Sequence, residues 1–354
     1  MSDNELDIQY RFFVVGERPL CVWGTDIQSL ALEFLDNLDA TYFEYIANTH
    51  SQNIIEDKPR EKESQFAALA IRTAYSQALE TLFALLCAAV QAPYCIHAWI
   101  DNYQSRELYA LVRKIHNRQP VETLLSVKRV TWQTIAEAVF ESLVLENKEK
   151  ESAIKQDFGN LWSQFASQFL DSNFSDEYNS IKHGLRVRPG GFSIAIGAED
   201  KPGVAVPKEK MQLLGRSEFG SQFLAAKKIG GNGQHIEMKR HHRNWSPEDL
   251  CWGLHLISLS IANVKSALRI INGVPATDVK FEWATDRGSF EEPWKRARQI
   301  GVTSMSGFQI DIKSDFITPF SKEEILARYR TGKDAGVKRL VFLDPGSGNA
   351  KNAS

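Results

Sequence analysis

Apolar residues recur every three or four positions along most of the chain, which is the spacing of an amphipathic α-helix. The longest runs cover residues 64–91 and 246–273, and the second begins with Ser246 as a cap and Pro247 in the first turn. Shorter runs predict further helices at residues 26–50, 94–115, 132–146 and 152–170. Because each apolar stripe must be covered, the pattern predicts a bundle of five or six helices with the two longest packed together.

A short helix followed by alternating residues interrupts this pattern. Ser175 is the predicted N-cap, and Gly184 is predicted to end the helix as a left-handed C′ residue. Residues 185–196 then alternate between apolar and polar side chains around a Pro-Gly-Gly turn, which predicts a β-hairpin. The Gly- and Lys-rich residues that follow, with a strand at 235–239, are expected to continue a β insertion.

The predicted fold class is therefore mainly α (α+β), with small β elements at both ends. Within the last part, residues 279–283 and 308–312 alternate like strands, and 322–330 resembles a short helix. The expected parts are a β-hairpin in 1–25, the helical bundle in 26–184 and 246–273, the β insertion in 185–245, an α+β extension in 274–344 and a disordered tail in 345–354.

Composition narrows the class of protein. The 354 residues are 43% hydrophobic and 24% charged with a formal charge of −2, so binding to nucleic acid would require a local basic patch. The four cysteines form no C-x-x-C pair and no signal peptide precedes them, so we expect a cytoplasmic protein without disulfides, metal or cofactor. The most apolar run, 82–90, is about half of a bilayer span, so no membrane segment is expected.

The short helix carries the densest group of reactive side chains. Tyr178 and Lys182 are four residues apart, as are Asn179 and His183, so the four side chains form two adjacent rows. Cleaving RNA without a metal requires a group that titrates near neutrality and a cation that stabilises the phosphorane. At a helix C-terminus the charged form of histidine is favoured, which suits phosphate binding or a general acid.

We assign the candidate roles accordingly. His183, Asn179 and Lys182 are the predicted catalytic residues. Arg186 and Arg188, which follow the helix, are the predicted phosphate-binding residues. Tyr178 and Glu80 are predicted to support them, since Glu80 lies with Arg72 and Ser76 on a polar row of the 64–91 helix and could face the site.

The sequence Tyr178-Asn179-Ser180-Ile181-Lys182-His183 resembles the HEPN family, helical-bundle proteins whose ribonuclease members carry an arginine, four to six residues with a polar one first, and then a histidine. Asn179 matches the polar position and His183 the histidine, while Tyr178 stands where the family has arginine. The resemblance covers residues 64–185 and the helix from Ser246. It implies metal-independent RNA cleavage, usually by a homodimer that joins two motifs, with His183 as acid or base and Asn179 orienting the phosphate.

The leading hypothesis is thus an HEPN-like protein of nucleic-acid biology, in its enzymatic form a ribonuclease of a defence or toxin system. One alternative is a catalytically silent interaction module, in which Lys182 and His183 only satisfy the helix end and Tyr178 packs into the bundle. Another is a small-molecule or nucleotide binder with an enclosed space beside Glu80. His241-His242-Arg243 is predicted to be a basic loop and not a metal site, because the P-C-x-x-C that completes the H-x-E signature is missing.

Overall fold

We describe a computed structural model of the chain, which divides into two compact units. The first comprises Met1–Ala225 with Arg240–Asp311, and the second Ala226–Lys239 with Ile312–Ser354. Every site discussed below lies in the first unit. The structure describes residues 8–55, 57–125, 127–199, 201, 203–229, 235–295, 309–311, 321–324 and 326–327.

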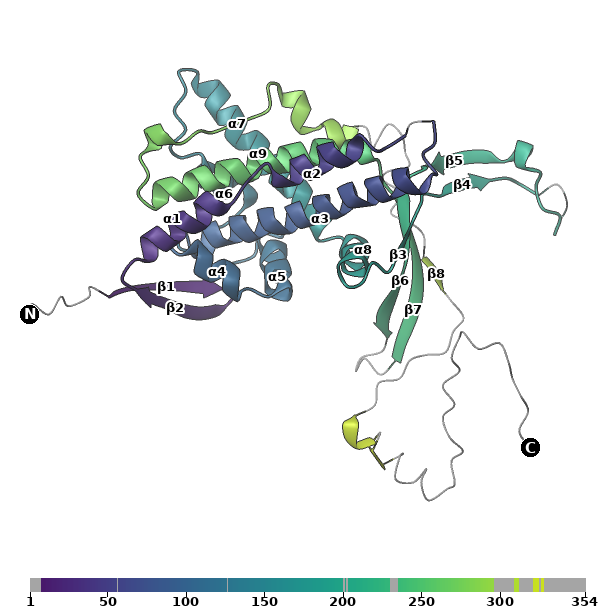
Figure 1. The fold of residues 1–354 in the computed structure, drawn as a ribbon, viewed down its shortest axis with the longest axis horizontal. Coiled ribbons are helices and arrows are strands. Elements are labelled where there is room, and N and C mark those ends of the chain that lie inside the picture. Colours follow the sequence, from purple (N-terminus) through teal and green to yellow (C-terminus); the bar gives the residue numbers. More distant parts are fainter. Residues whose placement is uncertain are drawn as a thin grey trace, which may run out of the picture. The chain divides into compact units, whose positions relative to one another are not determined.

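Two long helices, α3 (Lys62–Gln91) and α9 (Pro247–Ile271), pack side by side and form the centre of the bundle (Figure 1). The Ser246 hydroxyl caps α9 by accepting a hydrogen bond from the backbone N–H of Asp249 at 3.2 Å, with Pro247 in the first turn. Both the start of α9 and its pairing with α3 confirm the sequence-based prediction, because the regular apolar seam of each helix is buried against the other.

Further helices surround this pair, so the fold is mainly α. Helix α2 packs on both α3 and α9, α4 and α5 pack on α3, and α6 packs on α7. Their bounds are α1 (Ile27–Asn37), α2 (Tyr42–Ser51), α4 (Ile96–Asn102), α5 (Ser105–His116), α6 (Trp132–Val139), α7 (Lys148–Phe169) and α8 (Ser172–Lys182). The predicted helix at 132–146 is shorter, although Thr131 caps it as expected.

Two predicted helices are each divided in two, which the periodicity did not reveal. Between α1 and α2, the Asp39 carboxylate accepts hydrogen bonds from the backbone N–H and the hydroxyl of Thr41, at 2.8 and 2.7 Å. Between α4 and α5, the Glu107 carboxylate accepts from the backbone N–H of Gln104 at 3.0 Å and restarts the helix. Local hydrogen bonds of side chains to the backbone therefore interrupt a helix even where the apolar stripe continues.

The described strands form small antiparallel pairs and one larger sheet. Strands β1 (Gln9–Val15) and β2 (Arg18–Gly24) make the predicted N-terminal hairpin, in which Gly16 adopts φ +66°. The other sheets have the orders β3-β6-β7-β8 and β4-β5. Their strands are β3 (Val187–Pro189), β4 (Ser193–Ile196), β5 (Gln212–Arg216), β6 (Gly220–Ile229), β7 (His235–Asn244) and β8 (Gln309–Asp311).

The predicted hairpin within residues 185–196 is wrong. Strand β3 pairs with β6 and strand β4 pairs with β5, so the Pro-Gly-Gly segment carries the chain from one sheet to another. The backbone N–H groups of Gly190 and Gly191 donate to the carbonyls of Gly220 and Glu218. A Cβ at Gly191 would lie 2.2 Å from the carbonyl oxygen of Ser217, so only glycine permits this close approach.

Two other boundaries differ from the prediction. Helix α8 begins at Ser172, capped by Asp171 and not by Ser175, because the buried Phe174 extends its apolar face by one turn. Strand β7 runs to Asn244, so residues 241–243 are a strand and not a loop.

Residues 279–283 form no strand. Their backbone bonds to side chains of α9, since Asn263 donates to and accepts from the backbone of Glu282 at 2.6 and 2.8 Å. The predicted helix at 322–330 and the strand at 308–312 lie partly outside the described residues, and the tail 345–354 lies entirely outside them.

Helices α3 and α9 are also long and apolar enough to cross a membrane by length and composition. In the two apolar windows, 78% and 61% of the residues are buried inside the protein. Core helices of soluble proteins satisfy the same criteria, so the two helices do not identify a membrane protein.

The crossing of α3 and α9 depends on Gly253. A Cβ at this position would lie 2.6 Å from Cε2 of the buried Tyr75 ring. Gly253→Ala is therefore expected to cost about 1–3 kcal/mol through overpacking, partly offset by the roughly 1 kcal/mol better helix propensity of alanine. Denaturant unfolding measures this cost. In a Tyr75→Leu background the cost should disappear, and an equal cost in both backgrounds would refute the steric explanation.

Candidate functional site

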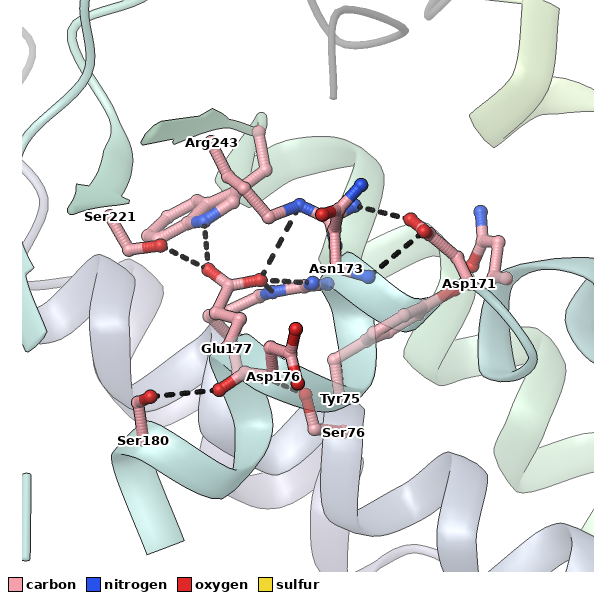
Figure 2. Close-up of polar contacts among 12 residues, drawn as sticks. Tyr75, Ser76, Asp171, Asn173, Asp176, Glu177, Ser180, Ser221 and Arg243 are labelled. Carbon is pink, nitrogen blue, oxygen red and sulfur yellow. Dashed lines mark hydrogen bonds and ion pairs between the residues drawn. The ribbon is translucent and has the colours of Figure 1, made fainter. Parts of the chain in front are cut away.

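Helix α8 is fixed to its neighbours by a buried network around Glu177 (Figure 2). Arg72 of α3 donates to Glu177 Oε2 through Nε at 3.1 Å and Nη2 at 2.6 Å. The Ser221 hydroxyl and Trp245 Nε1 both donate to Glu177 Oε1, the second at 3.0 Å. Arg243 Nε lies 3.7 Å from Glu177 Oε2. One carboxylate thus connects the bundle, α8 and the strands β6 and β7.

The same network reaches the N-terminus of α8. Arg243 Nη2 lies 3.2 Å from Asp171 Oδ2, and Asp171 Oδ1 accepts from the backbone N–H of Asn173 at 3.0 Å (Figure 2). Two carboxylates therefore face two guanidiniums. This balance allows Arg72, Glu177 and most of Arg243 to be removed from water, while the Asp171 side chain stays 32% exposed.

The electrostatics of Glu177 follow from these contacts. Burial alone would raise its pKa, but Arg72 and Arg243 together with the hydrogen bonds from Arg72 and Ser221 hold the pKa below 4.5. Burial lowers the pKa of Arg243, and Glu177 and Asp171 oppose that shift. Glu177 is accordingly ionised at neutral pH.

The structure brings together three residues predicted at the site. The Tyr178 hydroxyl donates to Glu80 Oε2 at 2.9 Å, and Lys182 Nζ lies 3.5 Å from the same oxygen and 5.4 Å from the Tyr178 ring centroid. Burial, and then Glu80, raise the pKa of Tyr178, so its hydroxyl stays protonated and acts as a donor. Arg72, which lies on the same polar row of α3, pairs with Glu177 and not with Glu80.

His183 and Asn179 lie at the exposed end of α8. The backbone N–H of His183 donates to the Asn179 carbonyl at 3.0 Å, and the Asn179 side-chain amide lies 3.5 Å from Ser175 Oγ. Both side chains are exposed, and across the described residues no hydrogen bond or ion pair engages the His183 imidazole. The imidazole is therefore accessible to a ligand from solvent.

A cavity of about 330 Å³ beside α8 lies at the opposite end of the helix. Asp171 and Phe174 line it together with Arg72 and Arg243, whereas the residues at the end of α8 do not. Arg72 and Glu80 are eight residues apart, which is about 12 Å along a helix. This cavity is thus not the space beside Glu80 that the small-molecule hypothesis requires.

Arg186 and Arg188 continue from the end of α8 onto the sheet. After Gly184 at φ +108°, Leu185 adopts φ +50° and the backbone N–H of Arg186 donates to the Ser180 carbonyl at 2.7 Å. Arg188 lies opposite Gln222 in the β3–β6 register. Both arginines are exposed, so the turn presents them beside Lys182 and His183 along the chain.

The structure adds residues to this surface that the sequence analysis did not select. Gln222 Nε2 lies 3.4 Å from His242 Nε2, which places Gln222, His242 and the neighbouring Arg188 across one face of the sheet. Burial, followed by Arg240 and His241, lowers the pKa of His242. His241 points the other way along the strand and stacks on Phe223 at 5.1 Å.

In the described part of the chain, no cluster of three or more His, Cys, Asp or Glu is arranged to hold a metal ion. Comparisons with protein-family models, curated proteins and solved structures found no match to this chain.

Proposed function

We propose that the chain binds RNA through the α8–β3 surface and cleaves it there without a metal. The α8–β3 surface comprises Asn179, Lys182, His183, Arg186 and Arg188. All five side chains are exposed. Within the described residues neither Arg186 nor Arg188 has a carboxylate partner, so both guanidiniums are available to phosphate oxygens.

The main support for this proposal is the uneven distribution of formal charge along the chain. Residues 185–245 contain eleven Lys and Arg against five Asp and Glu, a formal charge of +6 in a chain whose total is −2. The residues outside this segment therefore carry a formal charge of −8. A basic segment on an otherwise acidic protein favours binding of a polyanion at that segment.

The proposed cleavage uses His183 as acid or base and Lys182 as the cation. Glu80 and the Tyr178 ring fix the position of Lys182 one residue before the imidazole. Asn179 lies one helical turn earlier and would orient the phosphate. Since the reaction needs both an acid and a base, a second copy of the chain would supply the second imidazole in a homodimer.

RNA affinity measured against salt concentration tests the binding step. Arg186→Gln combined with Arg188→Gln is expected to reduce the slope of log K against log salt by about 1.4, since each single-strand phosphate contact contributes about 0.7. The matched control removes the exposed Arg106 and Arg113 of α5 in the same way. An equal loss in both double variants would mean that only bulk charge matters, and absence of binding by the wild type would reject the proposal.

A second candidate function is a silent interaction module. It is favoured by the contacts of the motif itself, because Tyr178 and Lys182 both engage Glu80 and Glu177 connects α8 to the sheet. In this hypothesis α8 is a structural joint between bundle and sheet. A protein that binds no RNA in the salt experiment, yet loses stability when Glu80 is changed to Gln, would favour the module.

A further inference from the structure

A second basic site lies on the bundle, away from α8. A cavity of about 370 Å³ is lined by the end of α5, the loop after it, the start of α6 and the middle of α7. We name it the Arg118–Arg129 cavity after two of its lining residues. We propose that this cavity binds a phosphate group, as inorganic phosphate or as the terminal phosphate of a small ligand.

The charge of its lining supports an anionic ligand. Arg118, Arg129 and His116 line the cavity, and no carboxylate is among the residues that line it. Over the described ranges neither Arg118 nor Arg129 forms an ion pair with a carboxylate. Arg118 and Arg129 thus bring two guanidinium charges to the lining that no described carboxylate neutralises, and a dianion bound there would accept their forked N–H groups.

The backbone conformation of Arg118 gives an independent reason to expect a ligand at this cavity. Helix α5 ends at His116 with Asn117 as its C-cap, so Arg118 is at the C′ position that glycine usually occupies. Arg118 adopts φ +56°, a left-handed conformation that is unfavourable for a residue with a side chain. An arginine that keeps this unfavourable conformation in place of glycine, at a position that lines a cavity, supports a role for the residue there.

Neutral donors complete the cavity. Trp132 Nε1 can only donate, and it lies 3.4 Å from His116 Nδ1, so in the neutral ring the proton is on Nε2. His116 Nε2 lies 3.5 Å from Ser167 Oγ. Gln133 and Asn160 add amide groups to the lining. The Trp132 and His116 N–H groups are used within this chain of contacts, so the side-chain amides of Gln133 and Asn160 are the neutral donors that accompany the two guanidiniums, and together they suit the many acceptor oxygens of phosphate.

Titration of the purified full chain with inorganic phosphate at constant ionic strength tests the proposal, with chloride as the balancing anion and calorimetry as the measurement. Wild-type protein is expected to bind one phosphate saturably. Arg118→Gly and Arg129→Gln are each expected to weaken that binding about tenfold or more, because each removes a charge-assisted hydrogen bond. Lys128→Gln is the matched control, since Lys128 is exposed beside Arg129 and does not line the cavity.

Arg118→Gly also separates binding from folding. Glycine adopts positive φ without strain, so this variant should melt at or above the wild-type temperature while losing phosphate. Unchanged phosphate affinity in both arginine variants, or no saturable binding by the wild type, would overturn the proposal. Tighter binding of adenosine 5′-monophosphate than of phosphate would identify a nucleotide as the ligand. Equal binding of the two would identify the free phosphate ion as the ligand. The Arg186→Gln and Arg188→Gln variant should bind phosphate normally, so failure of the RNA proposal does not affect this one.

Discussion

Glu177→Ala is expected to lower the free energy of unfolding by about 3–5 kcal/mol, because it leaves two buried guanidiniums without their shared carboxylate. Arg72 and Arg243 then face each other across the vacated position, with only Asp171 as a remaining acid in the network. Equilibrium denaturation in urea at pH 7 measures the loss. Glu177→Gln keeps the side-chain volume and an acceptor oxygen for Ser221 and Trp245, so the difference between the two variants reports those hydrogen bonds together with the cavity that alanine leaves.

The pH dependence provides the control for this prediction. Because the folded-state pKa of Glu177 is below the 4.5 of the free side chain, its ionisation stabilises the fold above about pH 4.5. That contribution is lost as the pH falls through the folded-state pKa. Glu177→Gln should therefore show a weaker loss of stability between neutral and acid pH than the wild type. An equal loss of stability at acid pH in the two proteins would contradict the lowered pKa of Glu177.

His183→Ala is expected to slow RNA cleavage by about 10²–10⁴-fold in the presence of a chelator, since that is the usual contribution of a general acid or base. The RNA affinity should change little, because the proposed phosphate contacts come from Arg186 and Arg188. Labelled RNA, incubated with purified protein and sampled over time, measures the rate. We therefore expect the histidine variant to change the cleavage rate and the arginine variants to change the RNA affinity.

His50→Ala, which removes a partly buried imidazole from α2, is the control for this experiment. Equal rates for wild type and His183→Ala would show that another group, or a contaminant, cleaves the RNA. If the wild type binds RNA and leaves it intact, catalysis is rejected and the binding proposal remains.

The parts of the fold that the sequence predicted well are those set by local spacing. The start of α9 followed from Ser246 and Pro247, and the proximity of Tyr178 to Lys182 follows from helix geometry alone. The start of α8 was misplaced because Asp171 and Ser175 are both suitable caps, and the burial of Phe174 decides between them.

Partners that are distant in sequence could not be predicted in the same way. Alternation at residues 185–196 indicated strands correctly, but it carries no information on which strand lies alongside, and so the hairpin was wrong. Glu177 meets Arg72 across 105 residues and Trp245 across 68. The sequence did show a carboxylate on the apolar face of a helix. Such a carboxylate requires a buried cationic partner, but the sequence does not identify that partner.

The span of the Glu177 contacts also has a consequence for how the protein assembles. Contacts that bridge 44, 68 and 105 residues close large loops, so they form only after the distant segments have met. Until α8 has docked on α3, Ser221 of β6 and Trp245, which follows β7, lack the Glu177 carboxylate that accepts their hydrogen bonds. Because one carboxylate makes these contacts, we expect the docking of α8 on α3 and its attachment to Ser221 and Trp245 to form and to be lost together.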